Sequence, residues 1–139
     1  MTLRLPTAEV TVLLGEPIVR RRLMAMFDDS SSAIRRVTVD PTSGVTERRR
    51  RLEEAGDAAI VLVDRVTDGL DATGRRAVLG VLAGLAARGA AVLVDDDDSV
   101  AALAVADGTL RADPVRGLVV EALGAAGSVA PLEELYRAS

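Results

Sequence analysis

Acidic residues stand at the ends of three apolar runs, where their carboxylates could hold a cation or a phosphoryl group. Four consecutive aspartates, which begin at Asp95, follow the run 90–94; Asp64 ends the run 58–64, and Glu16 comes just after the run 10–14. Clustered carboxylates of this kind suit a hard cation such as Mg²⁺. The pattern leaves three interpretations open: a metal site, part of a phosphate-handling pocket, or a solvated loop.

The composition narrows the chemistry that the chain can perform. Among its 139 residues there is neither cysteine nor histidine, so thiolate ligands, disulfides and imidazole bases are excluded. The formal net charge of −4 argues against direct binding of nucleic acid by the whole chain. Arginines cluster at 20–22 and 48–51, and we expect them to lie on solvated helix faces. No segment has the length and apolarity of a signal peptide or membrane span, which predicts a cytoplasmic protein.

Apolar runs of strand length alternate with segments of helical periodicity along the chain. Strands that are apolar throughout are buried on both faces, which is typical of a parallel sheet covered by helices. The sequence therefore predicts an α/β fold, a doubly wound (βα)5 sheet of the flavodoxin-like type with strand order 2-1-3-4-5. The predicted strands are 10–14, 33–39, 58–64, 90–94 and 108–112, and the predicted helices are 18–27, 44–56, 73–89, 99–106 and 115–127. The partly polar second strand is expected near an edge.

The carboxyl ends of such strands form the edge at which ligands bind. Glu16, Asp64 and Asp95 would end neighbouring strands there, so an acidic patch is predicted at this edge. Of the four consecutive aspartates, only Asp95 directly follows the buried strand, so it alone is expected to face the pocket. The three aspartates after it are interpreted as a solvated loop, with Asp98 or Ser99 as the N-cap of the next helix.

Three segments resemble the receiver domains of two-component response regulators, closest to those that precede a helix-turn-helix DNA-binding domain in transcription regulators. These are "VTVLLGEPIVRRRL" (10–23), "AAIVLVDRVTDG" (58–69) and "ALAVADGTLRADP" (102–114). The resemblance implies a CheY-like receiver domain over residues 1–127. Residues 128–139 would then be a C-terminal tail or the start of a linker to an effector domain.

In that family a histidine kinase transfers a phosphoryl group to an aspartate at the end of the third strand, and the resemblance places Asp64 there. The supporting positions depart from the family pattern. Glu16 stands alone where a pair of acids would hold Mg²⁺, and Asp95 takes the place of a hydroxyl. Ala112 occupies the place of a lysine, with Arg111 one residue earlier. The resemblance therefore implies a degenerate phosphorylation pocket.

The hypothesis favoured by these departures is an atypical receiver domain that is not an enzyme. It would signal by protein–protein contact or dimerisation through the fourth and fifth βα units, with no cofactor. One alternative is a working phosphoreceiver, in which Asp64 accepts the phosphoryl group and Glu16 and Asp64 hold Mg²⁺. A less favoured alternative is a Toprim-like, metal-dependent phosphotransfer enzyme, because Arg65 and Val66 follow Asp64 where a second aspartate is needed. Nothing matches the G-x-x-x-x-G-K-[ST] pattern of a nucleotide-binding loop.

Overall fold

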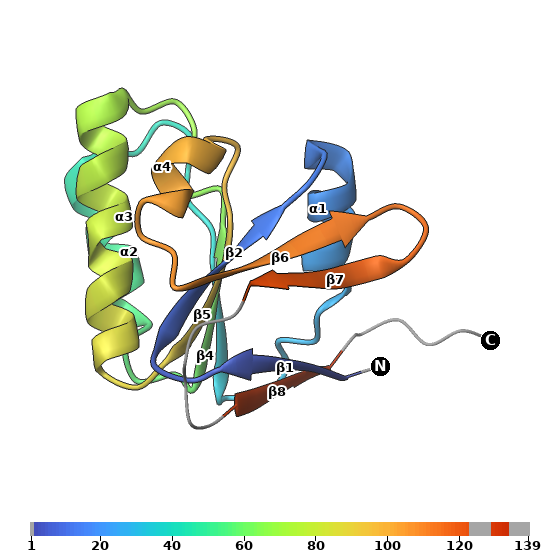
Figure 1. The fold of residues 1–139 in the computed structure, drawn as a ribbon. Coiled ribbons are helices and arrows are strands. Elements are labelled where there is room, and N and C mark those ends of the chain that lie inside the picture. The colour runs from blue at the N-terminus through green and yellow to red at the C-terminus, as the bar shows by residue number, and fades with distance from the viewer. Residues whose placement is uncertain (1, 123–128, 134–139) are drawn as a thin grey trace.

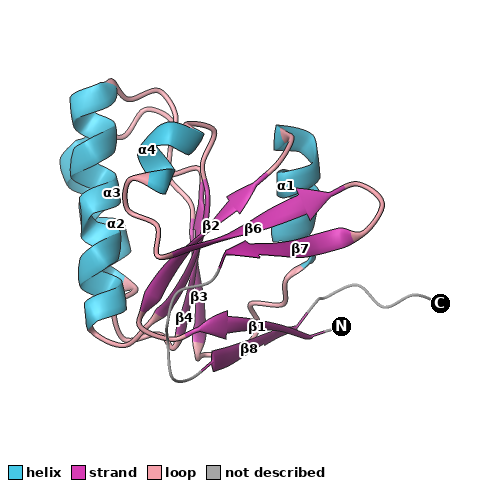
Figure 2. Cartoon of the chain, in the orientation of Figure 1, coloured by secondary structure: helices cyan, strands magenta, loops and turns pink. Residues whose placement is uncertain are grey.

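A six-stranded sheet forms the centre of the computed structural model, which describes residues 2–122 and 129–133 (Figures 1 and 2). Its strand order is β3-β4-β5-β2-β6-β7. The first five of these strands are parallel, and β7 pairs antiparallel with β6. The antiparallel strands β1 (Thr2–Pro6) and β8 (Val129–Glu133) form a second, two-stranded sheet. The strands of the six-stranded sheet are β2 (Glu9–Leu14), β3 (Ile34–Val37), β4 (Ile60–Asp64), β5 (Ala91–Asp95), β6 (Gly108–Asp113) and β7 (Gly117–Ala122).

The predicted α/β class with a mostly parallel sheet is confirmed, but the predicted strand order 2-1-3-4-5 is wrong. Counted in the order of the predicted strands, the observed order is 2-3-4-1-5. The first strand, β2, lies between β5 and β6, and the chain passes over β5 and β4 to reach the edge strand β3. The apolar runs could not reveal this, because burial on both faces is the same for β2 in either position.

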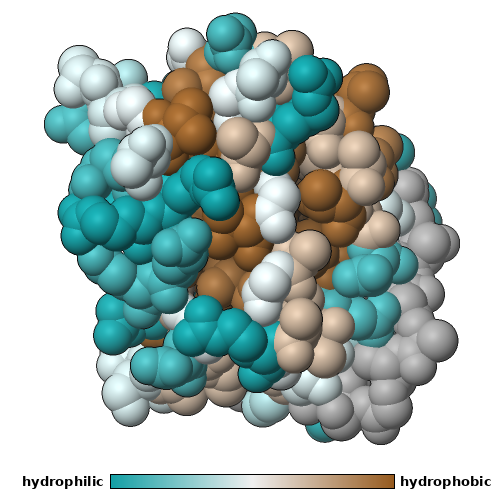
Figure 3. Space-filling model, turned by 90° about the vertical axis from the view of Figure 1, so that its left-hand side faces the viewer, coloured by the Kyte–Doolittle hydropathy of each residue, from teal (hydrophilic) through white to brown (hydrophobic). Residues whose placement is uncertain are grey.

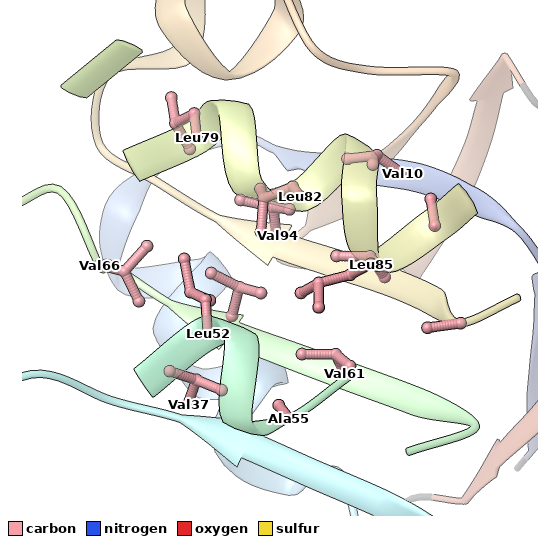
Figure 4. Close-up of a cluster of buried hydrophobic side chains, with 14 of the residues drawn as sticks. Val10, Val37, Leu52, Ala55, Val61, Val66, Leu79, Leu82, Leu85 and Val94 are labelled. Atoms are coloured by element: carbon pink, nitrogen blue, oxygen red, sulfur yellow. The ribbon is translucent and has the colours of Figure 1, made fainter. Parts of the chain in front are cut away.

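Helices cover both faces of the sheet. The helices α2 (Val45–Glu54), α3 (Ala72–Ala87) and α4 (Ser99–Leu103) pack on one face, and α1 (Pro17–Met26) packs on the other with the β1–β8 pair (Figure 1). Alternate strand residues feed the two cores, as the period of two requires. The core under α2 and α3 includes Val61 and Val94 with Leu52, Leu82 and Leu85 (Figure 4). The core under α1 includes Leu62 and Leu93.

The last predicted helix, 115–127, is wrong over its described part. After β6 the chain turns and returns as β7, which pairs with β6 from Asp113↔Gly117 to Thr109↔Ala122. The Asp113 carboxylate stabilises the turn, because it accepts the backbone N–H groups of Val115 and Arg116, both at 2.8 Å. The β-branched pair Val119 and Val120 also favours a strand.

Residues 123–127 of the predicted helix lie outside the described residues. So does most of the predicted tail or linker, 128–139, of which only 129–133 is described, as β8. Within the described part, no helix combines the length and the apolarity that a membrane crossing requires.

Candidate functional site at the carboxyl ends of the strands

The carboxyl ends of β4 and β5 bring two of the predicted site residues together. Asp64 and Asp95 are register partners, and they form the last pair of the β4–β5 ladder. Because side chains alternate along a strand, both lie on the same face as Leu62 and Leu93, the face that α1 covers. The two carboxylates therefore lie on the α1 side of the sheet, where Asp95 is fully buried and Asp64 is partly exposed.

A buried arginine of α1 binds the carboxylate of Asp95. Arg20 is 4% exposed and Asp95 is fully buried. The Nη1 of Arg20 lies 2.7 Å from Asp95 Oδ1 and also donates to the carbonyl oxygen of Asp96 at 2.9 Å. Its Nη2 lies 2.6 Å from Asp97 Oδ1, and its Nε donates to the carbonyl oxygen of Gly15 at 3.0 Å. One guanidinium thus joins the end of β2 to the end of β5.

Asp95 retains one carboxylate oxygen, Oδ2, that has no hydrogen-bond partner among the described residues. The pKa of Asp95 is raised from 3.8 to about 6, mainly because burial penalises the charged form. The nearby charges of Asp64 and Asp97 contribute to this rise, whereas Arg20 and Arg65 oppose it. The carboxylate is therefore held charged at neutral pH against a substantial desolvation cost.

Asp64 also has a counter-ion inside the chain. The Nη1 of Arg36, on β3, lies 3.2 Å from Asp64 Oδ2. Arg36 is held in place by Asp29, at 2.9 Å, and by the carbonyl oxygen of Phe27, at 3.0 Å. The candidate phosphoacceptor therefore lies between a second carboxylate, Asp95, and an arginine that already neutralises it.

The other two predicted site residues, Glu16 and Arg111, lie away from Asp64. Both line a pocket of about 540 Å³ at the ends of β2 and β6, together with Arg20 and Asp97. Since β5 separates β2 from β4, Glu16 and Asp64 do not end neighbouring strands, as the predicted order required. The three carboxylates still follow three consecutive strands, β4, β5 and β2, but β5 separates Glu16 from Asp64.

The separation of Glu16 from Asp64 bears on the predicted Mg²⁺ site. Among the residues that the structure describes, no group of three or more acidic side chains is placed to hold a metal ion. The arginines beside Asp64 and Asp95 supply the positive charge that a cation would supply. The geometry therefore does not fit a Mg²⁺ site formed by Glu16 and Asp64.

The loop after Asp95 is predicted to be solvated, but part of it is buried and hydrogen-bonded within the chain. Asp96 is buried, and its carboxylate accepts the Thr67 hydroxyl at 2.6 Å and the backbone N–H of Asp98 at 2.9 Å. Burial raises the pKa of Asp96. Asp98 is the N-cap of α4, as predicted: it accepts the N–H of Ala101 at 3.0 Å, which lowers its pKa. The expectation of a solvated loop is therefore wrong for Asp96.

Sequence reasoning assigned the arginine clusters to solvent and so missed two buried arginines. Besides Arg20, Arg48 of α2 is 1% exposed, and it donates to the Ser43 hydroxyl and to four backbone carbonyl oxygens in the segments before α2 and after β4. A signal was present, because Arg48 lies four residues before the buried Leu52 and Arg20 lies three before Leu23. Helical spacing puts each arginine on the inner face of its helix.

Comparison with known proteins indicates the fold and no family. No family model matches the chain, and no curated protein matches it. A solved structure described as the ATP binding subunit of an ABC transporter is similar, with a TM-score of 0.54 and 10% sequence identity. The similarity covers 77% of this chain and 75% of that one. At this identity the likeness establishes a mixed α/β fold with a mostly parallel sheet flanked by helices.

Proposed function

We propose that this chain is a non-catalytic domain that acts by protein–protein contact. The carrying observation is that two of the carboxylates that suggested chemistry already have counter-ions inside the chain, since Arg20 pairs with Asp95 and Arg36 pairs with Asp64. The proposal retains from the sequence hypothesis the expectation of signalling by protein–protein contact. The observed strand order differs from that of a receiver domain, so the proposal rests on the paired carboxylates and on the exposed surface around α4.

The pocket at the ends of β2 and β6, which Glu16 and Arg111 line, is poorly suited to bind phosphate. ATP-binding sites of the P-loop type surround phosphates with backbone N–H groups of a glycine-rich loop and with a lysine. Here Gly15, Glu16 and Pro17 lead directly into α1, and the Arg20 guanidinium is taken up by Gly15 and the aspartates of the β5 end. The negative Glu16 at the N-cap of α1 further disfavours an anion there. ATP binding, which the similar structure's description names, is therefore not proposed for this chain.

The surface around α4 offers an apolar contact area. Val100 and Leu103 are 79% and 43% exposed, although most side chains of their kind are buried here. Beside Val100, a hollow of about 470 Å³ between α3 and α4 is lined mainly by apolar side chains. This is the face of the fourth βα unit, where the sequence predicted contacts.

A second copy of the chain is the proposed occupant of this face. The rim of the hollow carries both signs of charge, from Arg76 and from Arg75 and Asp98, which pair with each other at 3.0 Å within the chain. Contact between identical faces around a two-fold axis needs such a mixture, because each charge must meet the opposite one. An apolar centre inside a polar rim is also the usual composition of a protein interface.

Sedimentation velocity over a range of concentrations tests this proposal. We expect a reversible dimer, which Val100→Asp should weaken about ten-fold or more by burying an unpaired charge. Val115→Asp is the matched control, because Val115 is 90% exposed at the β6–β7 turn, away from α4. A chain that stays monomeric at every concentration, or equal weakening by both variants, would contradict the dimer.

The non-catalytic part is tested separately with Mg²⁺ and a small phosphodonor such as acetyl phosphate, and with Mg²⁺ and ATP. We expect neither covalent labelling nor nucleotide binding. Labelling that disappears in Asp64→Asn would instead support the phosphoreceiver alternative. Saturable ATP binding would contradict the assignment of the β2–α1 segment as unable to hold phosphates.

A further inference from the structure

A second groove lies between α2 and α3, on the outer side of the molecule. It has a volume of about 570 Å³, and Arg49 and Glu53 line it from α2. From α3 it is lined by Arg76, Gly80 and Gly84 along with other residues of the same helix face. Figure 3 views the molecule from this side and shows apolar surface exposed between hydrophilic side chains. The groove lies on the other side of α3 from the α4 hollow proposed above for dimer contact, and Arg76 of α3 borders both.

Two glycines form an unusual part of this groove. Gly80 lies in the middle and Gly84 in the last turn of the 16-residue helix α3, where glycine is the least favourable residue apart from proline. Neither has a positive φ, and a Cβ on either would meet nothing within 4 Å. Neither the backbone conformation nor packing within the chain therefore requires glycine at these positions. A close approach by something outside the chain would require it, since only glycine leaves the helix backbone uncovered.

The charge of the groove is predominantly positive although the chain is negative overall. Arg49, Arg76 and Arg88 line it against the single carboxylate of Glu53. Arg88 is positioned by its contacts, because its guanidinium lies where a side chain on Gly56 would be and 3.7 Å from Asp57. Within the described part of the chain, Arg49 and Arg76 form no ion pair. Their charges are available to a partner.

We propose that this groove docks an acidic α-helix of a partner protein. Small side chains of that helix would lie against Gly80 and Gly84, and acidic side chains on its flanks would pair with Arg49, Arg76 and Arg88. A ridge of one helix fits the groove between two others, which is the ordinary mode of helix packing. A second copy of this chain is disfavoured, because the two positive grooves would face each other.

The proposal is tested with a synthetic helical peptide as long as α3, with alanine on one face and glutamate on its flanks. Added to the ¹⁵N-labelled full chain, it should cause saturable amide shifts centred on Gly80 and Gly84, with a Kd below about 1 mM. A matched peptide with lysine in place of glutamate should cause none. Absence of shifts with the glutamate peptide, or equal shifts with both peptides, would overturn the proposal.

Variants of the chain separate the charges from the glycines. Arg49→Ala should weaken peptide binding about two- to five-fold, the usual size for one exposed ion pair, and Arg49 does not border the α4 hollow. Arg50→Ala is its control, because Arg50 is an exposed α2 arginine that pairs with Glu47 and Glu54 and does not line the groove. Arg50→Ala should leave binding unchanged, and an effect equal to that of Arg49→Ala would overturn the charge assignment.

The glycine variants give the sharpest result, because the proposal predicts opposite effects on folding and on binding. Gly80→Ala and Gly84→Ala should raise the melting temperature, since alanine favours the helix and meets no neighbour. Each should weaken peptide binding about five-fold or more by filling the groove. Unchanged binding in both variants would overturn the groove as the contact surface.

Nucleic acid is the other polyanion that the arginines could attract. A short DNA duplex added to the same labelled chain should shift the groove amides less than the glutamate peptide does. A stronger response to the duplex would replace the acidic helix by a nucleic acid. Dimer formation through α4 is measured independently, so the two proposals can fail separately.

Discussion

The pH dependence of folding stability should report the buried carboxylate of Asp95. Asp95→Asn replaces it with an uncharged side chain of nearly the same shape. In the wild-type chain, the raised pKa means that the folded state binds the proton of Asp95 more tightly than the unfolded state does. The variant lacks this proton, so the difference between the two chains isolates its effect.

The sign and size follow from the two pKa values. A pKa of about 6 in the folded state against 3.8 is a difference of about 2 pH units, which corresponds to about 3 kcal/mol. The stabilisation from protonated Asp95 is fully present below pH 3.8. It is lost as the pH rises through about 6, because the charged form is the poorly solvated one. The free energy of unfolding of the wild type, relative to the variant, should therefore fall by up to about 3 kcal/mol from pH 4 to pH 7.5.

Urea denaturation of both chains at several pH values between 4 and 7.5 measures this difference. Asp57→Asn is the control, because it removes a fully exposed aspartate and leaves Asp95 with all the charges that shift its pKa. It should keep the pH dependence of the wild type. A difference between wild type and Asp95→Asn that stays constant across this range would refute the assignment of a desolvated, charged Asp95.

Three further substitutions test the packing around the site. Arg48→Met should lower the free energy of unfolding by about 2–4 kcal/mol in urea denaturation, because buried carbonyl oxygens lose their donor; a loss below about 1 kcal/mol would contradict this. Gly15→Ala should lower the melting temperature more than Gly89→Ala does: both glycines have positive φ, but only at Gly15 would the Cβ meet a backbone oxygen, that of Ala112 at 2.6 Å. Equal effects would show that the close approach is unimportant. Leu82→Ala should cost about 2–5 kcal/mol, measured by urea denaturation, because it opens a cavity in a fully buried position.

Local features of the fold were predictable because they depend on neighbouring residues in the chain. The β4 strand, Ile60–Asp64, coincides closely with the predicted run 58–64, since Val and Ile side chains suit a strand buried on both faces. The second predicted strand does lie at an edge of the sheet, as its polar residues suggested. Asp98 as an N-cap followed from its place just before a helix.

Features that depend on distant residues could not be predicted in the same way. The position of β2 between β5 and β6 depends on how the connection through α1 crosses the sheet, and no residue pattern in β2 records it. The strand β7 lies where a helix is predicted, because "VRGLVVEALGAAG" (115–127) also has apolar residues at helical spacing. Pairing with β6 decides the outcome there, and pairing is a tertiary property.

The carboxylates of the site were predictable from the sequence, but the arginines that neutralise them were not recognised, and they change how the site is interpreted. Acidic residues at strand ends indicate a pocket only if their counter-charge comes from outside the chain, as a metal ion or a ligand would supply it. Buried carboxylates need a partner, so an arginine on the inner face of the helix that covers them should be sought before a ligand is inferred. Arg20 lies on the inner face of α1, three residues before Leu23, and pairs with Asp95. Arg36 pairs with Asp64 from the neighbouring strand β3. The charges of Asp64 and Asp95 are therefore compensated by the fold, and this is why we propose partner contacts on the outer surfaces of α2, α3 and α4 and not at the strand ends.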